Sequence, residues 1–311
     1  TNYKGAFKSK NYIDKRFSDR EIDVLFVGTL VNPSEQKDSW NLLDPIIRDI
    51  LESISEKIIN GDHMLNISFE IRRTCLEKKL FLSQDEIIPL HTHIERYVRN
   101  YKRYELVKTL GKSGIKIHCY GNMEEYSKLN IFNSLVIHDK VNFQTLLDLY
   151  NNSKMVVSIT GHLYKGITER VVSSMLNGAV AIAERDNYTS QNFCDNENII
   201  LYDYNDLGKL IHTIKEYLKD IDKLGKIALE GEEVAKKYDC RILLTKIPRL
   251  MRSFDKGFNK EITVTKTFLP DKNKYIRYIN MIYESGQLTN RGQLVKKLEK
   301  RLEEYLGVKN L

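Results

Sequence analysis

Short apolar runs recur along the first two thirds of the chain, and most of them end in a glycine or a polar turn. They occupy residues 23–28, 115–121, 134–137, 154–161, 179–184 and 198–204. The runs are continuous rather than alternating, which is typical of parallel strands covered on both faces. Between them, residues 142–153 and 205–221 have apolar side chains at helical spacing, and Asn205 or Asp206 can cap the second helix. This alternation predicts an α/β fold with a doubly wound, mostly parallel, Rossmann-like sheet.

Residues 38–112 interrupt this alternation with a long, charged stretch of mostly helical pattern. An apolar stripe runs along its last part, and four basic residues lie close to the stripe in sequence: Arg96, Arg99, Lys102 and Arg103. We interpret them as a solvent-exposed helix face. The alternative is that one or two of them approach an anionic ligand.

Composition narrows the class of protein. A chain of 311 residues with 41% hydrophobic and 29% charged residues is typical of a soluble globular protein with about two domains. The net charge of +7 is modest and spread along the chain, so nucleic acid is not an expected partner. No apolar run approaches the roughly 18 residues of a transmembrane segment, and the first 30 residues lack a signal-peptide pattern. The four cysteines form no CxxC pair, which favours a reducing, cytoplasmic location.

The glycines that end the apolar runs predict the position of a binding site. In an open α/β sheet, ligands bind outside the carboxyl ends of the strands. Three strand-ending pairs mark this edge: Gly28-Thr29, Gly121-Asn122 and Gly161-His162. A helix beginning near Ile167 would direct free N–H groups at an anion, and Lys165 and Arg170 add positive charge. These residues predict an anion site, with an ordinary strand-to-helix turn as the alternative, in which Glu169 only compensates the helix dipole.

Other chemistry has weaker support. His91 and His93 could ligate a metal, but no third ligand is placed by sequence. Asp220 and Asp222 lie within an amphipathic helical pattern, so we predict no metal site there. No GxGxxG motif follows the first apolar run, which argues against a dehydrogenase.

Three segments in this order, "DVLFVGT", "IHCYGN" and "GHLYKGITERVVSSMLNGAVAIAERDNY", resemble the C-terminal half of GT-B glycosyltransferases. The spore-maturation-like branch of the group 1 enzymes is the most similar, and the resemblance covers about residues 10–255. It implies a cytoplasmic domain that binds a nucleotide-diphosphate sugar without metal or cofactor, for transfer to an unknown acceptor such as a cell-surface polysaccharide. It also implies that Arg170 contacts the diphosphate and Glu169 the ribose or sugar hydroxyls. Four further residues are expected near the nucleotide: Gly28, Thr29, Gly121 and Asn122.

The chain departs from that family in two respects. Many group 1 enzymes have two glutamates at the positions that Lys165 and Ser173 occupy here, so the usual ribose ligand is missing. The segment "KNYIDKRFSDREIDVLFVG" resembles the linker that enters the second domain of a GT-B enzyme. No catalytic residue is therefore assigned, and we do not expect this chain to transfer sugar by itself. The alternative is a non-catalytic Rossmann-like module that scaffolds an attached enzyme.

The end of the chain resembles a different enzyme. Residues 268–311, with a Ser-Gly-x-x-Thr-Asn-x-Gly turn and a helix ending near Leu-Gly-Val, look like the opening of a DegT-type sugar aminotransferase. The cofactor lysine of that family would lie further on, so no pyridoxal phosphate is expected on this chain. A leucine stripe, Leu294, Leu298, Leu302 and Leu306, predicts packing on the first domain, pairing between chains as a homodimer, or partial order. We therefore expect a linker at 1–21, a sugar-binding domain at 22–255, a linker at 256–267 and an aminotransferase segment at 268–311.

Overall fold

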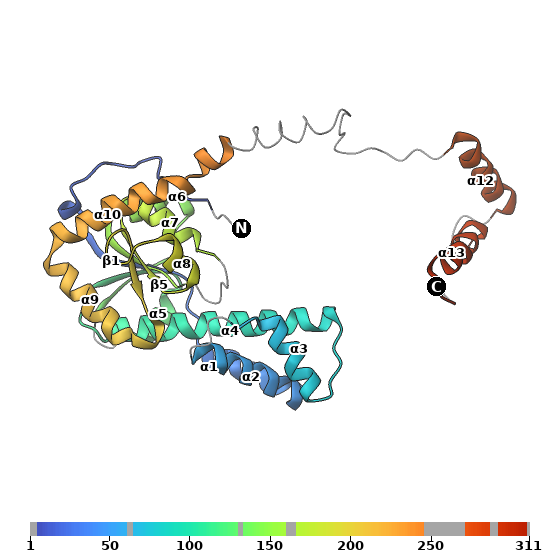
Figure 1. The fold of residues 1–311 in the computed structure, drawn as a ribbon, viewed down its shortest axis with the longest axis horizontal. Helices are drawn as coiled ribbons and strands as arrows, with labels where there is room; N and C mark the ends of the chain where they lie inside the picture. The colour runs from blue at the N-terminus through green and yellow to red at the C-terminus, as the bar shows by residue number, and fades with distance from the viewer. Residues whose placement is uncertain are drawn as a thin grey trace. The chain divides into compact units, whose positions relative to one another are not determined.

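The computed structural model describes residues 5–60, 65–129, 133–159, 166–245, 271–286 and 292–309 (Figure 1). The chain divides into two compact units, Thr1–Arg249 and Leu250–Leu311. Among the described residues, no helix has both the length and the apolar character that crossing a bilayer requires.

A six-stranded parallel sheet forms the centre of the first unit (Figure 1). Its strand order is β3-β2-β1-β4-β5-β6. The strands are β1 Ile22–Val27, β2 Ile117–Tyr120, β3 Leu135–His138, β4 Ser153–Val157, β5 Val180–Glu184 and β6 Ile200–Tyr202. Each strand overlaps one of the six apolar runs, and Leu25 of β1 lies beside His118 of β2 and Val156 of β4 in parallel register. The predicted fold class is confirmed.

Helices cover both faces of this sheet, so the sheet is doubly wound. The first unit contains α4 Gln84–Gly111, α5 Met123–Leu129, α6 Phe143–Asn151, α7 Glu169–Leu176, α8 Asn187–Asn192, α9 Leu207–Lys219 and α10 Ile221–Ala235. Phe26 packs with the second half of α4, α5 and α9, whereas its neighbour Leu25 packs with α6 on the other face. Val171 of α7 packs with Ala181 of β5, also on that second face. Asp206 caps α9 by accepting a hydrogen bond from Lys209 N at 3.0 Å, one of the two caps predicted.

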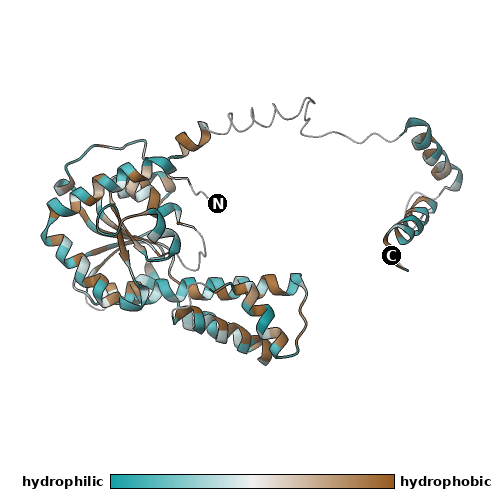
Figure 2. Ribbon diagram, viewed as in Figure 1, coloured by the Kyte–Doolittle hydropathy of each residue, from teal (hydrophilic) through white to brown (hydrophobic). Residues whose placement is uncertain are grey.

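A helical arm, residues 33–100, leaves the sheet after β1 and returns through α4 (Figure 1). It comprises α1 Pro33–Asp38, α2 Pro45–Ile59, α3 Ile67–Glu77 and the first half of α4. The arm has its own hydrophobic core, in which Trp40, Ile54 and Ile94 are fully buried. Hydropathy alternates along these helices, as expected for amphipathic helices that pack against one another (Figure 2). The predicted helical insertion is present, but its last helix also covers the sheet.

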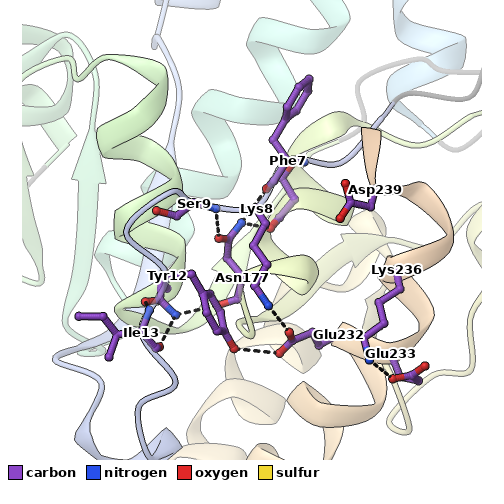
Figure 3. A network of polar contacts seen from close by, with 12 residues as sticks. Phe7, Lys8, Ser9, Tyr12, Ile13, Asn177, Glu232, Glu233, Lys236 and Asp239 are labelled. Carbon is purple, nitrogen blue, oxygen red and sulfur yellow. Dashed lines mark hydrogen bonds and ion pairs between the residues drawn. The ribbon is translucent and has the colours of Figure 1, made fainter. Parts of the chain in front are cut away.

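The N-terminal segment, residues 5–21, packs against the rest of the first unit (Figure 3). Asn177 at the end of α7 accepts a hydrogen bond from Ser9 N at 2.7 Å and donates one to the Phe7 carbonyl at 2.8 Å. Lys8 forms a 2.7 Å ion pair with Glu232 of α10. The segment expected to be a linker is thus bound by side chains of α7 and α10.

The described residues of the second unit form two amphipathic helices, α12 Lys272–Ser285 and α13 Gln293–Leu306. Gly286 ends α12 in the left-handed conformation (φ 63°), which favours glycine. Two helices were predicted here and two are present, while most of the predicted turn, residues 287–291, lies outside the described residues. Neither helix has a buried residue, so the leucine stripe is uncovered within the part of the unit that the structure describes.

Candidate functional site

The carboxyl edge of the sheet contains the point where strand order reverses, between β1 and β4. The chain leaves β1 toward the α4 face and continues from β4 to α7 on the other face, and in open α/β sheets a reversal of this kind is where ligands bind. Gly28 follows β1 and Gly121 follows β2, so both lie at this edge, as predicted. Gly161, His162 and Lys165 follow β4 but lie outside the described residues.

Gly28 and Gly121 bring two backbones into close contact. A Cβ atom on Gly121 would lie 2.2 Å from the Gly28 carbonyl oxygen, so no larger residue fits. That oxygen also accepts a 2.6 Å hydrogen bond from the Tyr126 hydroxyl. The Asn122 amide accepts from Leu30 N at 2.7 Å and donates to the Leu30 carbonyl at 2.8 Å. Gly121 and Asn122 therefore shape the loop after β1, and their contact with a nucleotide stays a prediction.

Arg103 reaches this edge from α4. Its Nη1 donates a 2.8 Å hydrogen bond to the Thr29 carbonyl, and a Cβ atom on Gly28 would lie 3.4 Å from its Nε. The Nε is buried, and no described residue accepts a hydrogen bond from it. Burial, together with the nearby positive charges of Arg170 and Arg99, lowers the pKa of Arg103 to about 10.

Arg170 reaches the same edge from the opposite face of the sheet, in the first turn of α7. Its charge acts on Arg103, Tyr126 and Tyr150, so its guanidinium lies near these three side chains. Its Nε is buried and lacks a hydrogen-bond partner among the described residues, and the guanidinium lies beside the Tyr150 hydroxyl. Burial raises the pKa of Tyr150 well above its usual range. Two guanidinium groups without a carboxylate partner in the described chain thus create a positive site at the strand ends.

Glu169 contacts a different part of the molecule. Its carboxylate accepts a hydrogen bond from the Ser173 hydroxyl, and Ser173 Oγ accepts one from Phe7 N at 3.0 Å. The serine at the usual glutamate position therefore joins Glu169 to the N-terminal segment. Whether Glu169 also meets ribose stays a prediction.

A buried ion pair joins the arm helix to the sheet next to this site. Lys102 Nζ lies 2.5 Å from a Glu184 carboxylate oxygen at the end of β5, and the two side chains are 1% and 5% exposed. The expectation of a solvent-exposed basic face is wrong for Lys102 and Arg103, although it holds for Arg96. The reason is that α4 changes environment along its length, because its second half packs on the sheet. Glu184 ends an apolar run, and the strand-end argument could have found it.

Metal chemistry has no support within the described residues, where no group of three or more His, Cys, Asp and Glu side chains gathers. Cavities lie elsewhere on the described part of the first unit, and two of them are lined by charged residues. One of about 290 Å³ is lined by Arg185, Asp195 and Tyr202 beyond β5 and β6. The other, about 420 Å³, lies beneath the N-terminal segment beside Arg20 and Glu232.

Comparison of this chain with solved structures gives alignments of low sequence identity and low TM-score. Sucrose-phosphate synthase from Thermosynechococcus elongatus aligns at 15% identity over 50% of this chain and 44% of its own, with a TM-score of 0.42. HepE from Anabaena, solved with UDP-glucose, aligns at 10% identity over 75% of this chain and 100% of its own, with a TM-score of 0.41. A glycosyltransferase from Rickettsia africae aligns at 13% identity over 75% of this chain and 71% of its own, with a TM-score of 0.42. Alignments this loose do not transfer residue roles.

Sequence comparison gives two matches of different extent. A dTDP-4-amino-4,6-dideoxy-D-glucose transaminase from Shigella dysenteriae is 45% identical over 49 residues, which is 16% of this chain and 13% of that protein. The chain therefore spans only a small part of that curated relative. Residues 99–247 match the family model described as glycosyl transferase-like, and this range includes Arg103, Arg170 and five of the six strands. In this range the chain is thus similar to glycosyl transferase-like domains.

Proposed function

We propose that the carboxyl edge of the sheet binds a nucleotide-diphosphate sugar as glycosyl donor. The observation that supports this most is the pair Arg103 and Arg170, which approach from opposite faces without a carboxylate partner among the described residues. Placing like charges together is unfavourable unless an anion joins them. A diphosphate carries phosphate oxygens that each guanidinium can bind with two parallel hydrogen bonds.

We propose that Arg103 and Arg170 also act in the transfer reaction. When the bond between the sugar anomeric carbon and the diphosphate oxygen breaks, the bonding electrons stay with the leaving nucleoside diphosphate. The acceptor hydroxyl oxygen forms the new bond, and its proton passes to a base or to the leaving diphosphate. Positive groups fixed at the diphosphate stabilise that developing charge. Each hydrogen bond to a charged group contributes about 1.5–3 kcal/mol, whereas the α7 terminus contributes about 0.3–1 kcal/mol. The arginines therefore dominate binding.

We propose that the acceptor side of the reaction is supplied by another domain. A transferase needs positioned groups on both sides of the reacting carbon. Within the described residues, Tyr150 is the uncharged polar group beside Arg170, and its raised pKa makes it a poor base. That other domain would then bind the acceptor and determine the stereochemical outcome.

The C-terminal unit has a separate proposed origin. We infer that residues 268–311 are the opening of a sugar aminotransferase, and the 49-residue match to a sugar transaminase supports this. The uncovered apolar faces of α12 and α13 also suit a segment that is completed by more chain. A fusion of this kind would join donor binding to an enzyme that makes amino sugars.

Calorimetric titration tests the donor proposal, with UDP-, GDP- and CDP-sugars added to the 311-residue chain. We expect heat of binding with at least one donor class. Arg170→Ala should weaken that binding ten- to a hundredfold, about 1.4–2.8 kcal/mol, which is the size of one charge-assisted hydrogen bond. Arg103→Ala should weaken it by a similar factor. Arg170→Lys should recover only part of the loss, because an ammonium group cannot bind two phosphate oxygens in the same fork geometry.

Arg185→Ala is the matched control, because Arg185 follows β5 at the same edge of the sheet but its charge is neutralised by Asp195. Its donor affinity should stay within twofold of the parent. No heat with any donor would favour the non-catalytic scaffold instead. If Arg170→Ala keeps the donor affinity of the parent and its circular dichroism spectrum is unchanged, the donor does not bind at the start of α7.

A further inference from the structure

The buried ion pair of Lys102 and Glu184 lies where α4 passes from the arm to the sheet (Figure 1). Tyr101, the residue before the lysine, packs against the arm core, and Tyr104, two residues after it, packs against the sheet core. Apolar contacts thus hold α4 on either side of the pair. The carboxylate belongs to the last residue of β5, so the pair joins α4 to the carboxyl edge of the sheet.

The two charged groups are held in place by further contacts. Lys102 Nζ lies 4.9 Å from the centroid of the Tyr204 ring, which is a cation–π contact. The Glu184 carbonyl accepts a 3.2 Å hydrogen bond from the Thr189 hydroxyl of α8. The same residue is in parallel register with Tyr202 of β6. The strand end that carries the carboxylate is therefore fixed by both α8 and β6.

Stability alone gives little reason for a buried ion pair at this place. Removing two charges from water costs free energy that their attraction often does not recover, and apolar residues of similar volume are frequently as stabilising. Leu106, Val107 and Leu110 already bury α4 against the sheet. Apolar contacts are not directional, so they define the rotation and the axial position of a helix less closely than a charge-assisted hydrogen bond does. The pair therefore adds a fixed position for this part of α4.

Arg103, the next residue of α4, depends on that position. Its guanidinium donates a 2.8 Å hydrogen bond to the Thr29 carbonyl and lies against Gly28. Successive residues of an α-helix are related by a rotation of about 100° and a rise of about 1.5 Å, so a contact that fixes Lys102 also fixes the Cα atom of Arg103. A displacement of about 1 Å is enough to break a hydrogen bond of normal length.

We propose that Lys102 and Glu184 are positioning residues, which hold the Arg103 guanidinium at the carboxyl edge of the sheet for the donor diphosphate. This role rests on the proposed function, in which Arg103 binds that group. The pair itself does not contact the donor and acts through α4. Because the arm, residues 33–100, is continuous with the same helix, the pair also keeps motion of the arm from displacing Arg103.

Lys102→Met with Glu184→Met tests this role, because the double variant removes both charges and replaces them with apolar side chains of similar length. A pair that only stabilised the fold would be replaced at little cost in unfolding free energy. The hydrogen exchange of the buried Arg103 Nε–H group, measured by NMR, reports the position of the guanidinium. Its signal is the one that Arg103→Lys removes. We expect this exchange to become at least about tenfold faster in the double variant, because the group gains access to water.

Two controls separate a local effect from a general one. The Arg20 Nε–H is also buried without an acceptor among the described residues, and its exchange rate should not change. Lys108→Met with Glu105→Met removes a 3.0 Å ion pair between two residues of α4, and should leave the Arg103 exchange within twofold of the parent. Glu184→Asp keeps the charge and withdraws it by one methylene. It should give an intermediate exchange rate, and it replaces the double variant if that variant does not fold.

Calorimetric titration with the donor gives the second measurement. Donor affinity should fall about fivefold or more in the double variant, which is part of the loss expected for Arg103→Ala. Unchanged Arg103 exchange in a folded double variant would overturn the positioning role, as would an equal acceleration in the Lys108 control. Faster exchange with the donor affinity of the parent would also overturn it. If the parent binds no donor, the donor proposal fails, while the exchange rates still decide whether the pair positions Arg103.

Discussion

At the residue scale, buried cations show how neighbours decide the role of a side chain. Arg20 is 5% exposed, and its Nη1 lies within hydrogen-bond distance of the carbonyls of Tyr150, Ser153 and Asn177. These carbonyls belong to the end of α6, the start of β4 and the turn after α7. Burial lowers the pKa of Arg20, but the group keeps its charge because its pKa begins so high. Arg20 therefore joins three elements through its Nη1, although its Nε, like those of Arg103 and Arg170, is buried without a hydrogen-bond partner among the described residues.

The first prediction concerns that structural arginine. Arg20→Met should lower the free energy of unfolding by about 3 kcal/mol, because the carbonyls stay buried without their donor. Urea denaturation followed by circular dichroism measures this change. Arg16→Met, at an exposed position four residues earlier, should change it by less than about 0.5 kcal/mol. A loss below 1 kcal/mol for Arg20→Met would show that the hydrogen bonds contribute little.

At the element scale, the strands near one edge of the sheet carry a stack of aromatic rings. His138 on β3 stacks on Tyr120 of β2 with ring centroids 4.2 Å apart, and His118 Nδ1 lies 3.1 Å from His138 Nε2. Burial lowers the pKa of both histidines, and for His118 the charges of His138 and Lys116 lower it further. The ring contacts between β2 and β3 thus include two imidazoles whose neutral form is favoured by burial.

A pH dependence of stability follows from these shifts. The folded chain binds protons at the two imidazoles less readily than the unfolded chain, in which a histidine has a pKa near 6.5. Stability from this pair is therefore fully present above about pH 6.5 and is lost as the pH falls from there toward the lower folded pKa values. His138→Phe keeps a ring on Tyr120 but does not titrate, so the loss of unfolding free energy between pH 7.5 and 5.5 should be smaller.

Urea titrations at pH 7.5, 6.5 and 5.5 check this prediction. His212→Gln, on the exposed side of α9, serves as the control and should keep the pH slope of the parent. If His138→Phe has the same slope as the parent, the stack does not control the pH response.

At the scale of the whole molecule, the two units differ in how they are stabilised. Residues up to Arg249 contain the hydrophobic cores of the sheet and of the arm. The helices of the second unit have no buried residue among those described. An apolar stripe of this size in water favours association.

We expect the chain to self-associate through α12 and α13. Sedimentation velocity should show a concentration-dependent dimer, and Leu298→Lys with Leu302→Lys should give a monomer, because two charges would be buried at the contact. A chain that ends at Arg249 should also be monomeric. Its unfolding free energy should match that of the first unit in the full chain within about 0.5 kcal/mol. A dimer that survives the truncation would place the contact on the first unit.

Several features of this protein follow from sequence alone, because they depend on neighbours along the chain. Continuous apolar runs predict buried parallel strands, and the strand-ending Gly28 and Gly121 predict the edge that holds the candidate site. The two C-terminal helices likewise follow from local periodicity and from a glycine stop at Gly286. In each case the signal lies within a few residues of the element.

Only the tertiary structure decided the composition of the candidate site. Arg103 and Arg170 lie far apart in sequence and approach each other because α4 passes the carboxyl edge of the strands on one face of the sheet and α7 begins there on the other. Lys102 has the sequence pattern of an exposed residue, yet it is buried against Glu184, 82 positions away. Periodicity shows which side of a helix is apolar but not what packs against it. The sequence of α4 therefore does not predict that its first half packs in the arm core and its second half in the sheet core. That change of environment, set by contacts between distant segments, places one of two neighbouring basic residues of α4 in a buried ion pair and the other at the carboxyl edge of the sheet.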